Sequence, residues 1–405
     1  MGPGPRARCA SLVARASCLA CALALSACAP SFTVTGFETL PEGHRGRAPN
    51  GRLTMEWSRR LAPEVEAPEL LGGPFLPIER AVPALDPAHD RVFVGSSAGA
   101  LWSFSGAGAE IWSYQAGGGI GSQPYVDPRN DELYFASDDG LLHALRASTG
   151  EVRWRAEVGG AVGRPPLATA DALYVITDAD WVIAFERATG ESLWRYHRDA
   201  PEGFYVAEHA GLVMAGRRVL TGFTDGFVVA LDASDGSVLW ERDTTSDLPE
   251  TDTLRFTDVD TTPVVIGDVV YAASFAGGLY SLELGSGTVR WLRSELTGVV
   301  GITEAPGGLL ILSSGDLGVV AIRAADGEQV WRTPVTRGSP TVARVVDDMV
   351  MLGESEGGLV TLALADGAEL GRIENGHGFA APVELAAGLG AVVSNAGGLF
   401  VFRVE

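Results

Sequence analysis

The chain contains no cysteine after residue 28. Its four cysteines, Cys9, Cys18, Cys21 and Cys28, all lie near the N-terminus of the 405-residue sequence. No disulfide can therefore cross-link the rest of the chain. A thiolate metal site and a cysteine nucleophile are excluded there as well, so the fold must depend on an apolar core.

Basic residues are also scarce. The sequence has 30 basic and 51 acidic residues. Without the N-terminal Arg6, Arg8 and Arg15 the balance is 27 − 51 = −24. A surface of this charge repels nucleic acid and anionic lipid headgroups, so we expect no nucleic-acid partner. Apolar runs are soon broken by Gly, Asp or Pro, and neither a membrane helix nor a long amphipathic helix is predicted.

The N-terminus has the layout of an export signal. Its three arginines precede the apolar stretch 19–25, which is too short to span a bilayer. The following Leu25-Ser26-Ala27-Cys28 resembles the lipobox of bacterial lipoproteins. We therefore predict a signal peptide at 1–27, lipid attachment at Cys28 and a flexible tether over 28–50. Contact with the membrane would be through the lipid alone.

One pattern recurs along the rest of the chain. It consists of a strand, a polar turn that closes on Gly, and a second strand that ends in Trp, as in 142–145, Gly150 and Trp154. The other copies end at Trp112, Trp194, Trp240, Trp291 and Trp331. A seventh copy, 359–362, has Gly371 where Trp is expected. Because structural repetition explains these tryptophans, we expect their indoles in the core rather than stacked on a ligand.

Two more β-rich segments precede each copy. Eight runs such as 91–94 and 133–135 form one set, and the other begins in several units at a proline, such as Pro124 or Pro263. Four short antiparallel strands per roughly forty residues is typical of a propeller blade. The sequence therefore predicts an all-β domain at 51–405, an eight-bladed β-propeller of four-stranded antiparallel blades.

The eighth unit ends after 399–402 and lacks its outer strand. The segment 53–57, which ends in Trp57, looks like that missing strand. Pairing of the N- and C-terminal strands would close the ring and remove exposed sheet edges, so we predict this closure.

Motifs that suggest chemistry fail in context. The run 95–99, centred on Ser97, matches a hydrolase nucleophile elbow but lies between two predicted strands, where a hairpin turn is expected. The glycines at 117–119 lack the helix that a phosphate site needs. No two of the six histidines have metal-ligand spacing. We expect no catalytic, cofactor-binding or metal-binding residue.

Two connections between blades are long. The Trp194–Trp240 interval is 46 residues (240 − 194) and the Trp240–Trp291 interval 51 (291 − 240), whereas others are 40 to 42. The extra residues fall at equivalent places in consecutive units, so both connections should project side by side on one face. Long connections on a rigid ring are usual places for binding.

The second of these connections carries the run Asp258-Val259-Asp260-Thr261-Thr262-Pro263. With the lipobox and eight units, this run resembles the BamB family of outer-membrane barrel-assembly lipoproteins. The resemblance implies a scaffold that binds periplasmic domains of the barrel-assembly outer-membrane protein and assists insertion of β-barrel proteins. It also implies that Asp258 and Asp260 contribute to that contact. Carboxylates there would steer a basic partner.

The other contact loop of that family carries Leu-x-Leu-Arg, which falls here on 203–206. The resemblance thus assigns Phe204 and Tyr205 to partner binding, although Val206 stands where Arg is expected. Ala29 after the lipidated cysteine implies delivery to the outer membrane, on its periplasmic face. We expect the propeller itself to be monomeric.

Two alternatives stay open from the sequence. The Val206 departure leaves room for a generic propeller adaptor with another ligand. The repeat is also similar to that of quinone-cofactor (PQQ) alcohol dehydrogenases, which use an adjacent cysteine pair and a calcium site. The sequence after residue 28 has no such cysteines, so we expect neither an enzyme nor a cofactor.

Overall fold

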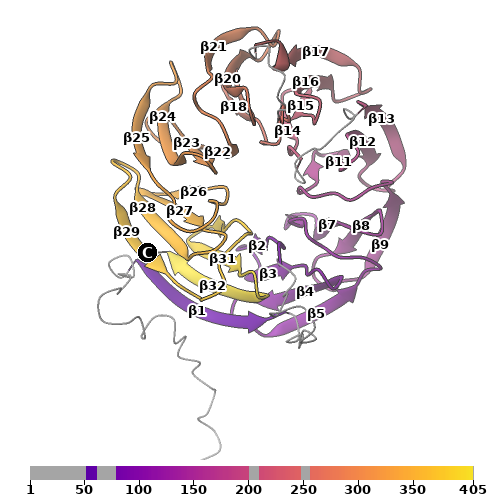
Figure 1. The fold of residues 1–405 in the computed structure, drawn as a ribbon. Coiled ribbons are helices and arrows are strands. Elements are labelled where there is room, and N and C mark those ends of the chain that lie inside the picture. The colour runs from indigo at the N-terminus through magenta and orange to yellow at the C-terminus, as the bar shows by residue number, and fades with distance from the viewer. Residues whose placement is uncertain (1–51, 62–78, 200–208, 248–255, 405) are drawn as a thin grey trace, which may run out of the picture.

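The protein, described here from a computed structural model, forms a ring of β-sheets (Figure 1). The structure describes residues 52–61, 79–199, 209–247 and 256–404. Within these ranges the strands form eight four-stranded antiparallel sheets that stand as blades around a central axis. The predicted all-β, eight-bladed propeller is confirmed.

Each blade takes four strands in chain order, from the centre of the ring outward, except the last. The strands of blades 1 to 4 are β2 (Ala84–Asp86), β3 (Arg91–Val94), β4 (Ala100–Ser105), β5 (Glu110–Gln115); β6 (Tyr125–Asp127), β7 (Glu132–Ser137), β8 (Leu141–Arg146), β9 (Val152–Glu157); β10 (Leu167–Ala168), β11 (Ala172–Ile176), β12 (Trp181–Glu186), β13 (Ser192–His197); and β14 (Val213–Ala215), β15 (Arg218–Gly222), β16 (Phe227–Asp232), β17 (Val238–Asp243). The strands of blades 5 to 8 are β18 (Val264–Ile266), β19 (Val269–Ser274), β20 (Gly278–Glu283), β21 (Val289–Arg293); β22 (Val299–Ala305), β23 (Leu309–Ser314), β24 (Gly318–Arg323), β25 (Gln329–Thr333); β26 (Arg344–Val346), β27 (Met349–Gly353), β28 (Leu359–Ala363), β29 (Glu369–Ile373); and β30 (Glu384–Ala386), β31 (Leu389–Val393), β32 (Gly398–Val404), β1 (Leu53–Arg60).

The eighth blade joins the two ends of the chain. Its outer strand is β1, which pairs antiparallel with β32 in the sheet β1-β32-β31-β30. Met55 lies opposite Phe402 and Trp57 opposite Val401. Figure 1 shows the indigo β1 beside the yellow β32 at the edge of the ring. The predicted closure between the termini is therefore confirmed.

The core consists of apolar side chains packed between neighbouring blades. The cluster between blades 2 and 3, for example, joins Tyr134 and Leu142 of one blade to Leu173 and Ile183 of the next. Both faces of a middle strand are buried in this way, which explains why β7, β11 and β27 are buried along their whole length. This burial provides the main stabilisation in a chain whose described part has no disulfide.

Most of the repeat tryptophans join one blade to the next at the outer rim. A β-bulge at the preceding residue, Leu193 in blade 3, interrupts the pairing just before Trp194. The Trp194 indole N–H then donates to the Ala233 carbonyl of blade 4, at 3.0 Å. A Cβ on Gly236, in the same turn, would lie 2.5 Å from that indole, so the ring packs directly on a glycine backbone. Equivalent indole N–H bonds are made by Trp57, Trp112, Trp154, Trp240 and Trp331.

The seam accounts for the missing tryptophan of the seventh unit. Each repeat tryptophan covers the turn between the two outer strands of the following blade, as Trp57 covers Gly108 of blade 1. In blade 8 those two strands are the ends of the chain, so no turn joins them. Gly371 precedes this seam, where an indole would have no glycine turn to cover.

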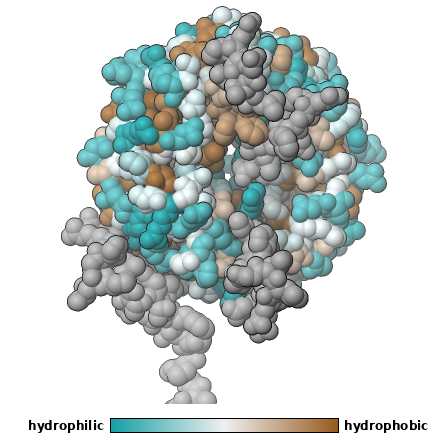
Figure 2. Space-filling view, viewed as in Figure 1, coloured by the Kyte–Doolittle hydropathy of each residue, from teal (hydrophilic) through white to brown (hydrophobic). Residues whose placement is uncertain are grey.

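We call one end of the ring the connection face. It carries the turns between the second and third strands of each blade, such as 95–99 and 223–226, and the connections from one blade to the next, including 198–212 and 244–263. Figure 2 shows hydrophobic and hydrophilic residues interspersed over the face in view. The two long connections both belong to this face.

Candidate functional site on the connection face

The first long connection is fixed at its start by Arg198. Its guanidinium bonds to Asp225 at 2.7 Å and to Glu241 at 2.8 Å, both in blade 4. It also lies over the Phe227 ring, 4.1 Å from the centroid. Burial opposes the charged form, but the Tyr196 hydroxyl and the Asp225 carboxylate raise the pKa of Arg198 above its usual value. The connection therefore leaves blade 3 from a rigid point anchored on blade 4.

The second long connection is fixed at its start by a capped turn. The Asp243 carboxylate accepts a bond from the backbone N–H of Thr245, at 2.8 Å, and so caps the 3-10 helix η2 (Thr245–Asp247). The Tyr280 hydroxyl of blade 5 donates to the Thr244 carbonyl at 3.0 Å. Both stems are thus rigid, and the segments they lead into, 200–208 and 248–255, lie outside the described residues.

The far ends of both connections are tied together. The Thr262 hydroxyl accepts the backbone N–H of Gly211 at 2.9 Å. Arg164, from the connection between blades 2 and 3, donates to the carbonyl of His209 at 2.6 Å and to that of Asp260 at 3.3 Å. The described ends of the two connections therefore lie side by side, as the repeat spacing predicts.

Comparison with other blades shows where the second connection departs from the repeat. The Asp258 carbonyl accepts a bond from the first residue of the next turn, Phe275. The carbonyls of Gly119, Ala161 and Gly378 accept the same bond in other blades. The neighbouring Val259 packs on Gly222 as Ile120 packs on Gly95 and Phe379 on Gly353. Gly298 and Ser339 accept it in two more, so Asp258 occupies a position that holds Gly, Ala or Ser in these other connections.

The next acidic residue departs from the repeat in the same way. Counting from Val259, Asp260 takes the position of Gly121 and Ala380. The propeller forms without a carboxylate at either position in those blades. The two acidic side chains are therefore a local addition that the framework does not require.

An aromatic pair stands beside these carboxylates. Phe256 and Phe275 meet edge to face, with centroids 6.0 Å apart and planes at 81°. Phe256 takes the position of Gly117 and Gly376, while Phe275 takes that of Asp138, Asp178 and Asn395. These equivalents are small or polar, whereas the connection between blades 5 and 6 holds the apolar Leu296 at the position of Phe256. Neither phenylalanine carries a recognisable motif in the sequence, and the pair becomes visible when the repeats are aligned with one another.

The two carboxylates themselves are buried. Asp258 is 2% exposed and Asp260 is 9% exposed, whereas Phe256 is 42% exposed. The sequence places the acidic pair in a surface connection and gives no sign of this burial. The other residues expected to bind a partner, Phe204 and Tyr205, and the lipid-attachment residue Cys28 lie outside the described residues.

A buried ionisable group faces the acidic pair from the first connection. Burial lowers the pKa of His209, while Asp180, Asp178 and Asp258 act in the opposite direction. His209 Nδ1 lies 3.8 Å from a carboxylate oxygen of Asp180. Asp180 also accepts a hydrogen bond from the Thr224 hydroxyl of blade 4. Ionisable groups of blade 3 and of both long connections therefore lie near one another here.

The serine motif that suggested a hydrolase is a hairpin turn, as predicted. Residues 95–99 join β3 to β4, and Ser97 donates to the buried Glu79 at 3.0 Å. No helix follows the serine, so the elbow geometry is absent at this turn.

A buried histidine network escaped the sequence analysis. His143 bonds through Nε2 to the Ser137 hydroxyl at 2.7 Å and through Nδ1 to the Tyr114 hydroxyl at 3.2 Å. Its ring stacks on Phe135 with centroids 4.7 Å apart. Burial lowers the pKa of His143 to about 4. The pair of Ser137 and His143 is fully buried, so it serves packing between blades 1 and 2.

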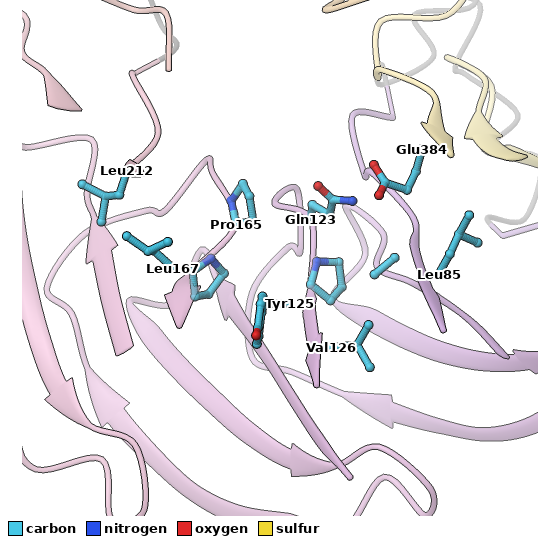
Figure 3. A pocket seen from close by; sticks show the side chains of 11 residues that line it. Leu85, Gln123, Tyr125, Val126, Pro165, Leu167, Leu212 and Glu384 are labelled. Carbon is cyan, nitrogen blue, oxygen red and sulfur yellow. The ribbon is translucent and has the colours of Figure 1, made fainter. Parts of the chain in front are cut away.

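The inner strands enclose a hollow of 340 Å³ (Figure 3). Most lining side chains are apolar, such as Leu85, Tyr125 and Leu167. The Gln123 amide donates to the Pro83 carbonyl at 3.0 Å, and Glu384 pairs with Arg344 at 3.5 Å. The polar groups named here therefore bond within the protein.

Within the described ranges, no group of three His, Cys, Asp or Glu side chains is placed to hold a metal ion. In the same ranges no helix has the length and apolar character needed to cross a membrane.

Comparison with known proteins identifies relatives. The chain is 28% identical over 255 residues to outer membrane protein assembly factor BamB of Shewanella oneidensis, covering 62% of this chain and 62% of that protein. The chain thus spans less than two thirds of that relative's length. It is 29% identical over 331 residues to the protein of the same name from Burkholderia pseudomallei, covering 78% and 82%.

Solved structures share the fold. BamB from Moraxella catarrhalis superposes with a TM-score of 0.72 and 23% identity, over 87% of this chain and 99% of that one. A quinohemoprotein alcohol dehydrogenase from Pseudomonas putida has a TM-score of 0.67 and 12% identity, over 87% and 76%. At these identities the likeness shows the propeller architecture.

The family described as outer membrane protein assembly factor BamB matches residues 103–333, which is more than half of the chain. The matched segment runs from blade 1 to the end of blade 6 and includes both long connections. The relatives carry the same name. This chain belongs to the BamB family of outer membrane protein assembly factors.

Proposed function

We propose that the protein is a non-catalytic scaffold of β-barrel assembly at the outer membrane, and that its connection face docks onto periplasmic domains of the barrel-assembly outer-membrane protein. Relatives named as outer membrane protein assembly factors support the role. The observation that carries the choice of surface is the local departure from the repeat at 256–260, where Phe, Asp and Asp replace Gly, Gly and Gly of blade 1.

The proposal includes two further partner-binding residues, the lipid anchor and a monomeric propeller. Phe204 and Tyr205 lie in the first long connection, whose described end bonds to the second at Thr262. Acylated Cys28 would hold the protein at the outer membrane on its periplasmic face. A monomeric propeller on a tether fits this arrangement, because a ring closed by its own termini needs no second copy to cover a sheet edge.

Co-purification tests the docking surface. Full-length protein is isolated from solubilised membranes with and without the double change Asp258→Lys and Asp260→Lys. We expect the wild type to retain the barrel-assembly protein and the double variant to lose it. Retention by the folded double variant at moderate salt would contradict the assignment.

A matched control uses the opposite end of a blade. Asp326 and Glu328, also one residue apart, lie in and after the exposed turn between β24 and β25. Changing both to Lys alters charge equally and should leave the complex intact. Because Asp258 and Asp260 are buried, the paired change to Asn, which keeps the shape, is measured alongside with a thermal melt to separate misfolding from lost docking.

A further inference from the structure

The side chains of the 256–260 segment differ in their exposure to solvent. Phe256 is exposed, while Asp258 and Asp260 on the same segment are almost fully buried. A partner that approaches the folded surface therefore meets the phenyl ring before it meets either carboxylate. Burial of an aromatic ring on binding is a common source of affinity in protein interfaces.

The phenyl ring is held in a defined position. Phe275, half-buried in the turn between β19 and β20, contacts Phe256 edge to face. The Phe275 backbone N–H in turn donates to the Asp258 carbonyl at 2.9 Å. Turn and connection are thus locked together, so Phe256 projects from a rigid base and loses little freedom when it is buried.

The exposed apolar side chains of the described residues make this position distinct. Ile111, Leu193, Val238, Leu239 and Val330 lie on outer strands of the blades, at or beside the repeat tryptophans. Of the exposed large apolar residues in the described ranges, Phe256 and Trp181 lie at the connection face. Trp181 is stacked on His197, with centroids 4.2 Å apart. Phe256 is the one within a connection between blades.

The surrounding charge defines the partner. The sequence from Asp243, the last residue of β17, to Asp260 contains six acidic residues and one arginine, a net charge of −5. An apolar ring at the end of so acidic a segment is complementary to an apolar socket bordered by arginine or lysine. The net negative charge of this stretch of sequence would raise the rate of encounter with such a surface and would disfavour acidic partners.

We infer that Phe256 is the apolar anchor of the docking surface, that it enters an apolar socket with a basic border on the partner protein, and that Asp258 and Asp260 act as positioning residues that hold the connection in place. This inference rests on the proposed docking function. It assigns direct contact to a residue that the acidic motif leaves out.

The test measures affinity and local order together. The full chain in detergent is titrated with the purified periplasmic domains of the barrel-assembly protein, and Phe256→Ser is compared with Val330→Ser, a change at a side chain that is 48% exposed on β25. We expect Phe256→Ser to weaken binding at least tenfold with an unchanged melting temperature, and Val330→Ser to bind like the wild type.

The acidic residues are tested by their conservative variants. Asp258→Asn and Asp260→Asn should speed hydrogen exchange of the amides of 256–262 in the free protein, because a positioning role acts without the partner. Binding of the Phe256→Ser variant with wild-type affinity, or unchanged exchange in both Asn variants, would overturn the inference. Failure of the wild type itself to bind would instead reject the docking function on which it rests.

Discussion

The outer rim keeps the residues of the repeat from blade to blade, whereas one segment of the connection face replaces them. At the rim the pattern is kept, and Trp194 on Gly236 is reproduced at Trp112 on Gly150 and at most other blade junctions. On the connection face the segment at 256–260 abandons the residues that equivalent positions hold. The rim positions are constrained by packing, since a larger residue has no space there. The departures have no such explanation, which is why we place recognition at that segment.

Removal of β1 should produce the largest effect, because it opens the ring. Deleting 53–60 leaves the β32 edge unpaired and removes the contact of Trp57 with Gly108. We expect the melting temperature to fall by roughly 10 °C or more, well beyond the 2–4 °C that a loss of about 1 kcal/mol causes in a domain of 150–250 residues. Deleting 40–47, an equal length within the predicted tether, is the control. An unchanged melting temperature for the first deletion would show that closure contributes little.

Exchanging one tryptophan of each kind sharpens the comparison. Trp240 is 7% exposed at the rim and Trp181 is 36% exposed at the connection face. We expect Trp240→Ala to lower the free energy of unfolding by about 3–5 kcal/mol, the cost of a large cavity. Trp181→Ala should cost less than about 1 kcal/mol, as is usual at exposed sites. Urea titration measures both, and equal losses would mean that the rim has no special part in stability.

His143 tests a departure from the repeat that lies in the core. The residues at the equivalent position of the third strand in blades 3 and 4, Ile183 and Val229, are apolar. Burial lowers its pKa to about 4, so between pH 6.5 and 4 the unfolded chain takes up a proton that the folded chain refuses. The free energy of unfolding therefore keeps the full contribution of neutral His143 above pH 6.5 and falls by up to about 3 kcal/mol toward pH 4.

The change His143→Gln should remove this part of the pH dependence while docking stays unchanged. Melting temperatures of wild type and variant between pH 7.5 and 4 provide the measurement. Parallel curves over that range would show that His143 does not set the slope.

A pair of glycine changes separates crowding from backbone conformation. Gly236 and Gly159 have nearly the same backbone torsion, with φ of 74° and 77°. A Cβ on Gly236 would lie 2.5 Å from Trp194, whereas one on Gly159 would meet nothing within 4 Å. Both changes to Ala carry the cost of a left-handed residue, but Gly236→Ala should lose about 1–3 kcal/mol more through overpacking. Equal losses of unfolding free energy for the two variants in chemical denaturation would mean that the Trp194 indole moves aside at little cost.

Much of the fold could be predicted from the sequence because each repeat carries the same residues that pack one blade against the next. Trp in an outer strand and Gly in the preceding turn recur where blades meet, so eight units and the orphan strand that contains Trp57 were enough to predict a closed ring. Gly371 was visible as an exception, but its reason is the missing turn at the seam, which exists only once the ring is closed.

The site was harder to predict because its properties depend on contacts between blades. Asp258 and Asp260 were singled out by family resemblance, yet their burial follows from three connections that meet through Arg164, His209 and Thr262. Phe256 belongs to the same segment and was passed over, since an isolated phenylalanine in a connection has no signature. Its significance appears when hydrogen bonds align it with Gly117 and Gly376.

The most direct test of the central claim restores the repeat at the site. The segment 256–260 is replaced by the residues that blade 1 has at 117–121, Gly-Gly-Gly-Ile-Gly. If recognition lies in the departures and stability in the repeat, the variant keeps a cooperative melt within a few degrees of the wild type and loses binding to the barrel-assembly protein. Wild-type affinity of this folded variant would contradict the account.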